Sequence, residues 1–78
     1  MKYLLVEDNH DLANAVCSRI GLDGHTVDHA AKIEDAVAFV QAGEYDLILL
    51  DIMLPDGDGH SFLKQHRADK NDTPAIIL

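Results

Sequence analysis

The sequence lacks several features, and each absence excludes a class of protein. Cys17 is the single cysteine among 78 residues, so no internal disulfide can form, and we expect a buried, inert thiol in a reducing compartment. No stretch approaches the roughly 18 apolar residues of a membrane-spanning helix, and Met1 and Lys2 run directly into a strand-like segment. We therefore expect a cytoplasmic chain with no membrane contact and no signal peptide.

Basic residues are scarce as well. Six Lys and Arg stand against fourteen Asp and Glu, and the formal net charge is -8. A nucleic-acid surface needs clustered Lys and Arg to neutralise phosphates, so this segment is not expected to bind DNA or RNA. An acidic surplus suits cation binding, although most carboxylates in a folded protein simply face water.

Short apolar runs predict the strands of a sheet. The runs 3–6, 47–50 and 75–78 are continuous, which is typical of parallel strands covered on both faces. The segment 25–29 alternates between apolar and polar residues, which indicates an edge strand.

Helical periodicity fills the intervals between these strands. The first helix is bounded by Asn9 and Gly21, and its apolar stripe consists of Leu12, Ala15, Val16 and Ile20. The second helix ends at Gly43, and its stripe consists of Ile33, Ala36, Val37 and Val40. A third helix is predicted to start near Gly59 and to pack through Phe62, Leu63 and His66. Strands that alternate with helices predict an α/β fold with a parallel sheet and right-handed crossovers.

Three acids occupy the ends of two predicted strands. Glu7 and Asp8 follow the first strand directly, and Asp51 closes the third. Open parallel sheets bind ligands outside the carboxyl ends of their strands, so the three carboxylates meet if these strands are neighbours. Clustered carboxylates repel one another, and a divalent cation relieves that repulsion. Oxygen ligands in an open crevice favour Mg²⁺.

Asp51 is also the best candidate for a reacting group. Aspartyl phosphates are established covalent intermediates, and a bound cation would neutralise the charge that develops on the phosphoryl oxygens. Asp51 ends the central strand and precedes a loop in which Pro55, Gly57 and Gly59 are turn residues that bring backbone close to a ligand.

Several separated runs match one family pattern at the expected distances. The runs Leu-Leu-Val-Glu-Asp at 4–8, Asp-Leu-Ile-Leu-Leu-Asp at 46–51, Met-Leu-Pro at 53–55 and Asp-Gly at 58–59 resemble the receiver domain of bacterial two-component response regulators. The resemblance implies a flavodoxin-like, doubly wound parallel sheet with strand order 2-1-3-4-5. It also implies that Asp8, Asp51 and the backbone carbonyl of Met53 hold Mg²⁺, with Glu7 acting directly or through a water. In that family the aspartate like Asp51 accepts a phosphoryl group from a sensor histidine kinase, and the domain is a phosphoacceptor that assists its own chemistry, not an enzyme.

The same resemblance implies that residues 1–78 are the N-terminal part of a receiver, truncated after the fourth strand. Receivers carry a Ser or Thr after that strand and a Lys after the fifth, and the chain stops at Leu78 before either. The 1–8 and 51–55 runs look most like regulators whose receiver precedes a winged-helix domain, so we expect any DNA contact in a C-terminal domain outside this chain. We also expect the apolar strand at 75–78 to expose an edge through which the fragment dimerises or otherwise associates.

Other interpretations fit less well but remain open. A receiver-like interaction module that is never phosphorylated would keep the same acids. A Mg²⁺-dependent phosphatase working through an aspartyl phosphate resembles a D-x-D pattern, and here Met53 replaces the second acid. A calcium loop at 56–59 would need acids where Leu54 and Gln65 stand, and dinucleotide binding would need glycines after the first strand. Five histidines share no ligand spacing, so we expect each at the surface or at a helix end: His10, His25, His29, His60 and His66.

Overall fold

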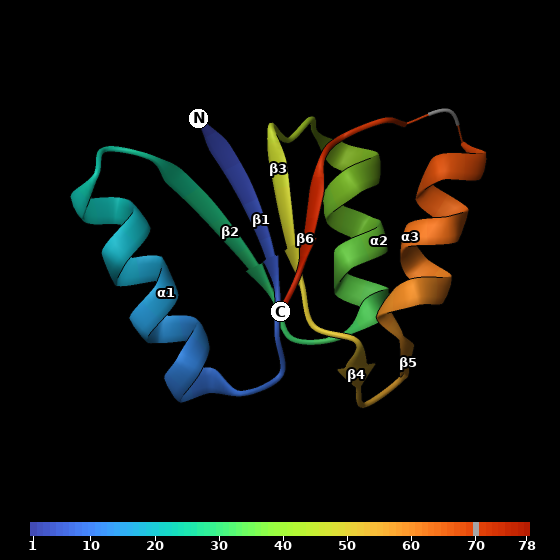
Figure 1. Cartoon of the computed structure of the whole chain (residues 1–78), viewed down its shortest axis with the longest axis horizontal. Coiled ribbons are helices and arrows are strands. Elements are labelled where there is room, and N and C mark those ends of the chain that lie inside the picture. The colour runs from blue at the N-terminus through green and yellow to red at the C-terminus, as the bar shows by residue number, and fades with distance from the viewer. Residues whose placement is uncertain (70) are drawn as a thin grey trace.

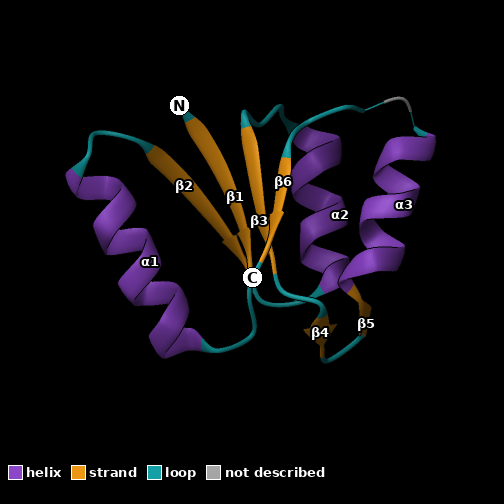
Figure 2. Cartoon of the chain, viewed as in Figure 1, coloured by secondary structure: helices purple, strands orange, loops and turns teal. Residues whose placement is uncertain are grey.

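The computed structural model describes residues 1–69 and 71–78. In chain order the elements are β1 (Lys2–Val6), α1 (His10–Leu22), β2 (Thr26–Ala30), α2 (Ile33–Ala42), β3 (Leu47–Leu50), β4 (Met53–Leu54), β5 (Gly57–Asp58), α3 (Gly59–Ala68) and β6 (Ala75–Ile77). The predicted strands and helices are all present, each within about two residues of the expected ends. Figure 2 shows the resulting layers, with the strands between helices on both sides.

The main sheet has four parallel strands in the order β2-β1-β3-β6. This is the predicted doubly wound order, with β6 as the fourth strand of the main sheet, and β2 lies at the edge as expected. Helix α1 covers one face of the sheet, while α2 and α3 lie together on the other (Figure 1). The strands of the sheet run in the same direction, so β1 and β3 deliver the residues that follow them to the same edge.

The larger core lies between the sheet and the pair of helices α2 and α3. Alternate residues of β1 and β3 point into it because side chains of a strand alternate between faces. The buried cluster consists of Leu4, Val6, Ala30, Ala36, Ile48, Leu50 and Phe62. Leu4, Val6, Ile48 and Leu50 come from the apolar runs of β1 and β3. Leu5, whose side chain points to the other face, is fully buried as well, so the apolar composition of β1 agrees with burial on both faces.

Helix α1 differs from the prediction in its buried face and in its end. Leu12 is 46% exposed and Ala15 is exposed, whereas Ala13 is fully buried. Val16 and Ile20 of the predicted stripe are half-buried, and Ala13 and Cys17 complete the inward face. The helix contains two overlapping apolar patterns, and only docking on the sheet selects between them. Gly21 remains inside the helix, and the left-handed residue that ends the turn is Gly24, at φ 83°.

A small antiparallel hairpin, formed by β4 and β5, was not predicted as strands. Met53 pairs with Asp58 and Leu54 pairs with Gly57, and Pro55 and Asp56 form the connection. Strands of two residues carry no periodicity, so the sequence indicated turn residues here and nothing more. The hairpin turns the chain from the end of β3 to the start of α3.

Candidate functional site

The site is built where β1 and β3 end side by side. Val6 is the register partner of Leu50, and the backbone N–H of Asp51 donates to the carbonyl of Val6 at 2.9 Å. On the other side of β1, the N–H of Glu7 donates to the carbonyl of Ala30 at 3.0 Å. Because these hydrogen bonds continue the ladder past the strands, the first residues after them are held as firmly as the sheet.

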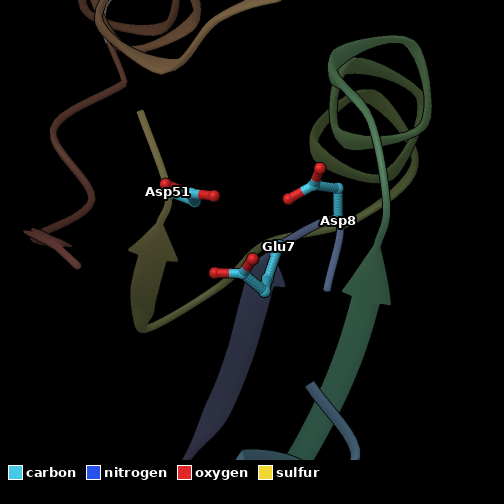
Figure 3. A group of neighbouring side chains, drawn as sticks. All are labelled: Glu7, Asp8 and Asp51. Carbon is cyan, nitrogen blue, oxygen red and sulfur yellow. The ribbon is translucent and has the colours of Figure 1, made fainter. Parts of the chain in front are cut away.

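Three carboxylates converge at this edge. One oxygen from each of Glu7, Asp8 and Asp51 can be chosen so that all three lie within 4.8 Å of one another. Figure 3 shows the three side chains facing one another across the gap between the ends of β1 and β3. The grouping predicted from the sequence is therefore present in three dimensions. Such a set of oxygen ligands matches the preference of a hard divalent cation.

The three acids differ in their surroundings. Glu7 is buried, with 4% of its surface exposed, whereas Asp51 is half-buried and Asp8 is exposed. Burial raises the pKa of the Glu7 carboxyl above its usual value, and the N–H of Asn9, which donates to Glu7 Oε1 at 3.1 Å, acts in the opposite direction. The nearby charge of Asp51 raises the pKa of Glu7 further. A nearby cation would therefore stabilise the ionised form of Glu7.

The loop after Asp51 is held close to the site by backbone contacts. The N–H of Met53 points at Asp51 Oδ1 at 3.4 Å, and the N–H of Gly59 donates to the carbonyl of Ile52 at 2.7 Å. A Cβ at Gly59 would collide with the carbonyl oxygen of Asp51, so a side chain cannot stand at this position without moving the backbone. Gly59 therefore stands where two backbone segments approach closely, and the approach of this loop to a ligand stays a prediction. Met53 begins β4 with an exposed side chain, and the ligand role of its carbonyl stays a prediction.

Two polar residues beside the site had not been connected with it from the sequence. The Nε2–H of His29 donates to the carbonyl of Glu7 at 2.7 Å, since that oxygen can only accept. The ring of His29 meets that of His10 edge to face, with centroids 5.8 Å apart. Asp56, in the turn of the hairpin, bonds to the start of α2. Finding His29 beside the site would have required the pairing register of β1 and β2. No local sequence pattern indicates that Asp56 lies near the site.

The remaining predictions about single residues have mixed outcomes. Asn9 caps α1 as expected, because its side-chain oxygen accepts from the N–H of Leu12 at 3.0 Å. Cys17 is half-buried and not fully buried as predicted, but burial still raises the pKa of its thiol, which agrees with the predicted inert role. His66 lies in the last turn of α3, one of the two kinds of position expected for it, but it is not at the surface, since only 6% of it is exposed. The expected packing of α3 through Phe62 and His66 is confirmed.

Comparison with known proteins identifies the family. A model of the response regulator receiver domain matches residues 3–78. The chain belongs to the response regulator receiver family. This membership confirms the resemblance drawn from the 4–8, 46–51 and 53–59 runs, and it makes the chain a receiver domain of the two-component type, a regulatory phosphoacceptor class and not a classical enzyme.

The named relatives of this receiver are regulatory proteins. The chain is 41% identical over its whole length to the transcriptional regulatory protein DltR of Streptococcus agalactiae, of which it covers 35%. It is 42% identical to the swarming motility regulation protein RssB of Serratia marcescens, of which it covers 36%. The receiver thus spans about a third of the length of the curated relatives it matches.

Solved structures agree with the fold. The receiver domain of the Francisella response regulator 1452 superposes with a TM-score of 0.93 at 30% identity, covering 97% of this chain and 63% of that one. The MaeR response regulator bound to beryllium trifluoride gives a TM-score of 0.92 at 29% identity, covering 100% and 66%. Within residues 1–69 and 71–78, the receiver has no helix with the length and apolarity that crossing a bilayer requires.

Proposed function

We propose that this receiver accepts a phosphoryl group on Asp51 from the phosphohistidine of a sensor histidine kinase, with Mg²⁺ held by the acidic cluster. The observation that carries the proposal is the convergence of Glu7, Asp8 and Asp51 within 4.8 Å at one edge of a parallel sheet. Membership in the receiver family supports the same chemistry.

The three acids differ in ways that suit separate roles. Asp51 is half-buried and follows β3, so one of its oxygens can face an incoming phosphorus atom while the backbone holds the residue in place. Attack by that oxygen forms a P–O bond as the P–N bond of the phosphohistidine breaks, and the departing imidazole takes up a proton. Asp8 is exposed and free to approach a hydrated ion, and buried Glu7 acts directly or through a water.

The donor set fits Mg²⁺. It consists of carboxylate oxygens, to which the backbone carbonyl of Met53 would be added, and part of it is exposed so that waters can remain on the ion. The raised pKa of Glu7 marks a site that favours added positive charge. When bound, Mg²⁺ supplies neutralisation of the charge on the transferred phosphoryl oxygens.

The wider protein is proposed to be a transcription regulator. Its relative DltR is named as a transcriptional regulatory protein, and this chain covers about a third of it. We place residues 1–78 in the N-terminal part of the receiver, with the rest of the receiver and a DNA-binding domain following. Phosphorylation of Asp51 would then switch DNA binding by that later domain.

The proposal is tested by phosphorylation of the full-length protein with a small phosphodonor such as acetyl phosphate and Mg²⁺. Wild type should gain one phosphoryl group in the intact mass, and Asp51→Asn should gain none. Asp8→Asn should react more slowly and require more Mg²⁺, because one of the exposed ligands is lost. The matched control is Asp72→Asn, which removes one charge from an exposed residue in the segment before β6 and should behave as wild type.

Two results would reject the assignment. Equal labelling of wild type and Asp51→Asn would place the phosphoryl group elsewhere. Absence of labelling in wild type, with phosphodonor and with its kinase alike, would favour the interaction module that keeps the acids but takes no phosphate.

A further inference from the structure

Asp56 joins the hairpin to helix α2. Its carboxylate accepts hydrogen bonds from the backbone N–H groups of Ile33, at 2.7 Å, and Glu34, at 3.0 Å. These are orphan donors of the first turn, which usually bond to the residue just before the helix. Here that residue is Lys32, whose side chain makes no capping hydrogen bond. The cap of α2 therefore comes from a turn that is more than twenty residues away in the sequence.

A second contact supports the same junction. Gly57 lies so close to Ile33 that a Cβ there would stand 3.3 Å from Ile33 Cγ1. The hairpin backbone at Gly57 therefore contacts the start of α2. The neighbouring carboxylate of Asp56 accepts hydrogen bonds from the N–H groups of the same turn. Contact and cap together fix the hairpin against a helix that is itself packed on the sheet.

The electrostatics agree with a permanent cap. The hydrogen bonds from Glu34 and Ile33 lower the pKa of Asp56, although partial loss of water opposes them, and the charge of Lys32 lowers the pKa further. A carboxylate is also favoured at the positive end of a helix dipole. These interactions therefore favour the ionised form of Asp56 that accepts the two hydrogen bonds.

The hairpin held in this way carries the backbone next to the acidic cluster. Met53 opens β4, two residues after Asp51, and its N–H faces Asp51 Oδ1. On the other strand, Asp58 is the register partner of Met53, and the next residue, Gly59, bonds back to Ile52. A movement of the turn at Asp56 would therefore be passed along two short strands to the backbone beside Asp51.

We propose that Asp56 is a positioning residue for the phosphoryl-accepting site: by tying the hairpin to α2, it holds the backbone of Met53 in place for Mg²⁺. The inference rests on the proposed function of the cluster, which it deepens. Asp56 touches neither the ion nor the phosphoryl group, so its effect is expected on Mg²⁺ affinity through geometry alone.

The test separates the link between the hairpin and α2 from ordinary helix capping. In the full-length protein, Asp56→Ala removes both the cap and the tie. Adding Lys32→Ser gives α2 a local cap, because residue 32 has the extended backbone of an N-cap, yet it leaves the hairpin untied. Asp72→Ala is the control for charge. The readouts are the melting temperature, the Mg²⁺ dissociation constant by calorimetry, and hydrogen exchange of the amides at 53–59.

The expected results differ between the variants. Asp56→Ala should lower the melting temperature of the full-length protein by about 2–4 °C, the effect of one lost cap, and weaken Mg²⁺ binding about tenfold, as losses of outer-shell support do. The double variant should regain the melting temperature while Mg²⁺ binding stays weak and the 53–59 amides exchange faster than in wild type. Asp72→Ala should match wild type in all three readouts.

Restored Mg²⁺ affinity in the double variant would overturn the inference and leave Asp56 as a helix cap alone. If wild type itself bound no Mg²⁺, the proposed function would fall. Hydrogen exchange would then test whether Asp56 holds the hairpin against α2. Unchanged protection of the hairpin amides in the double variant would reject that role too.

Discussion

The imidazole of His66 stacks on the ring of Phe62 in the core beneath α3, with centroids 6.0 Å apart and planes inclined by 14°. His66 is 6% exposed, and neither Nδ1 nor Nε2 has a hydrogen-bond partner among the described residues. A buried polar group without a partner costs stability, so this packing is achieved against the preference of the imidazole for water.

Replacing His66 by leucine should therefore stabilise the receiver. His66→Leu removes two unpaired nitrogens and keeps an apolar side chain against Phe62, and the gain should be about 1–3 kcal/mol. Urea denaturation at pH 7.5 measures it. His60→Leu, on an exposed position of the same helix, is the matched control and should give no comparable gain. A loss of stability in His66→Leu would mean that the imidazole makes a favourable contact.

The same residue should make stability depend on pH. Burial lowers the pKa of His66 below its usual value near 6.5, the charge of Arg67 lowers it further, and Asp69 acts in the opposite direction. The unfolded chain then binds a proton more readily than the folded one, so stability falls as the pH drops through 6.5 toward the folded-state pKa. Wild type should lose more stability than His66→Leu between pH 7.5 and pH 5. Parallel pH profiles of the two proteins would exclude His66 as the cause.

Gly59 should tolerate no side chain. Gly59→Ala forces a Cβ against the carbonyl oxygen of Asp51 and within 3.0 Å of Ile52 Cα, and it should cost about 1–3 kcal/mol, as overpacking does. Gly21→Ala is the control because its Cβ would meet open space inside α1, where alanine is favoured by about 0.5–1 kcal/mol. Denaturant midpoints of the two variants should move in opposite directions. A neutral Gly59→Ala would show that the loop has room to shift.

Mg²⁺ should stabilise the full-length protein more than an equal ionic strength of NaCl does. The carboxylates of Glu7, Asp8 and Asp51 repel one another until a cation is bound, and a ligand at ten times its dissociation constant adds about 1.4 kcal/mol. Thermal denaturation with matched MgCl₂ and NaCl measures the difference. Asp8→Asn should show a smaller Mg²⁺ response than wild type. Identical curves in the two salts would argue against a formed site.

A polypeptide of residues 1–78 alone should self-associate at the β6 edge. Ile76 is 52% exposed and Leu78 is 53% exposed, and within the described residues β6 pairs with β3 on one side only. An apolar strand with unpaired backbone groups is a template for another chain. Sedimentation at micromolar concentration should show dimers or larger species, and Ile76→Lys should reduce them. A monomer with cooperative unfolding would contradict this expectation.

Much of this protein follows from the sequence by itself. Continuous apolar runs determined β1, β3 and β6, because such runs are typical of the strands of a parallel sheet. The position of acids directly after two of these runs determined the acidic cluster, since parallel strands bring their carboxyl ends to one edge. These features are local or depend only on strand order, so the sequence alone predicts them.

The tertiary structure alone decided the rest. It selected Ala13 over Leu12 for the inward face of α1, because a helix with two overlapping stripes is oriented only by docking. It left both ring nitrogens of His66 without a hydrogen-bond partner among the described residues, where stacking on Phe62 outweighs a polar preference. It also brought Asp56 to the start of α2, a contact between residues 23 positions apart that no periodicity records. Such contacts depend on how elements pack, and packing is a property of the whole chain.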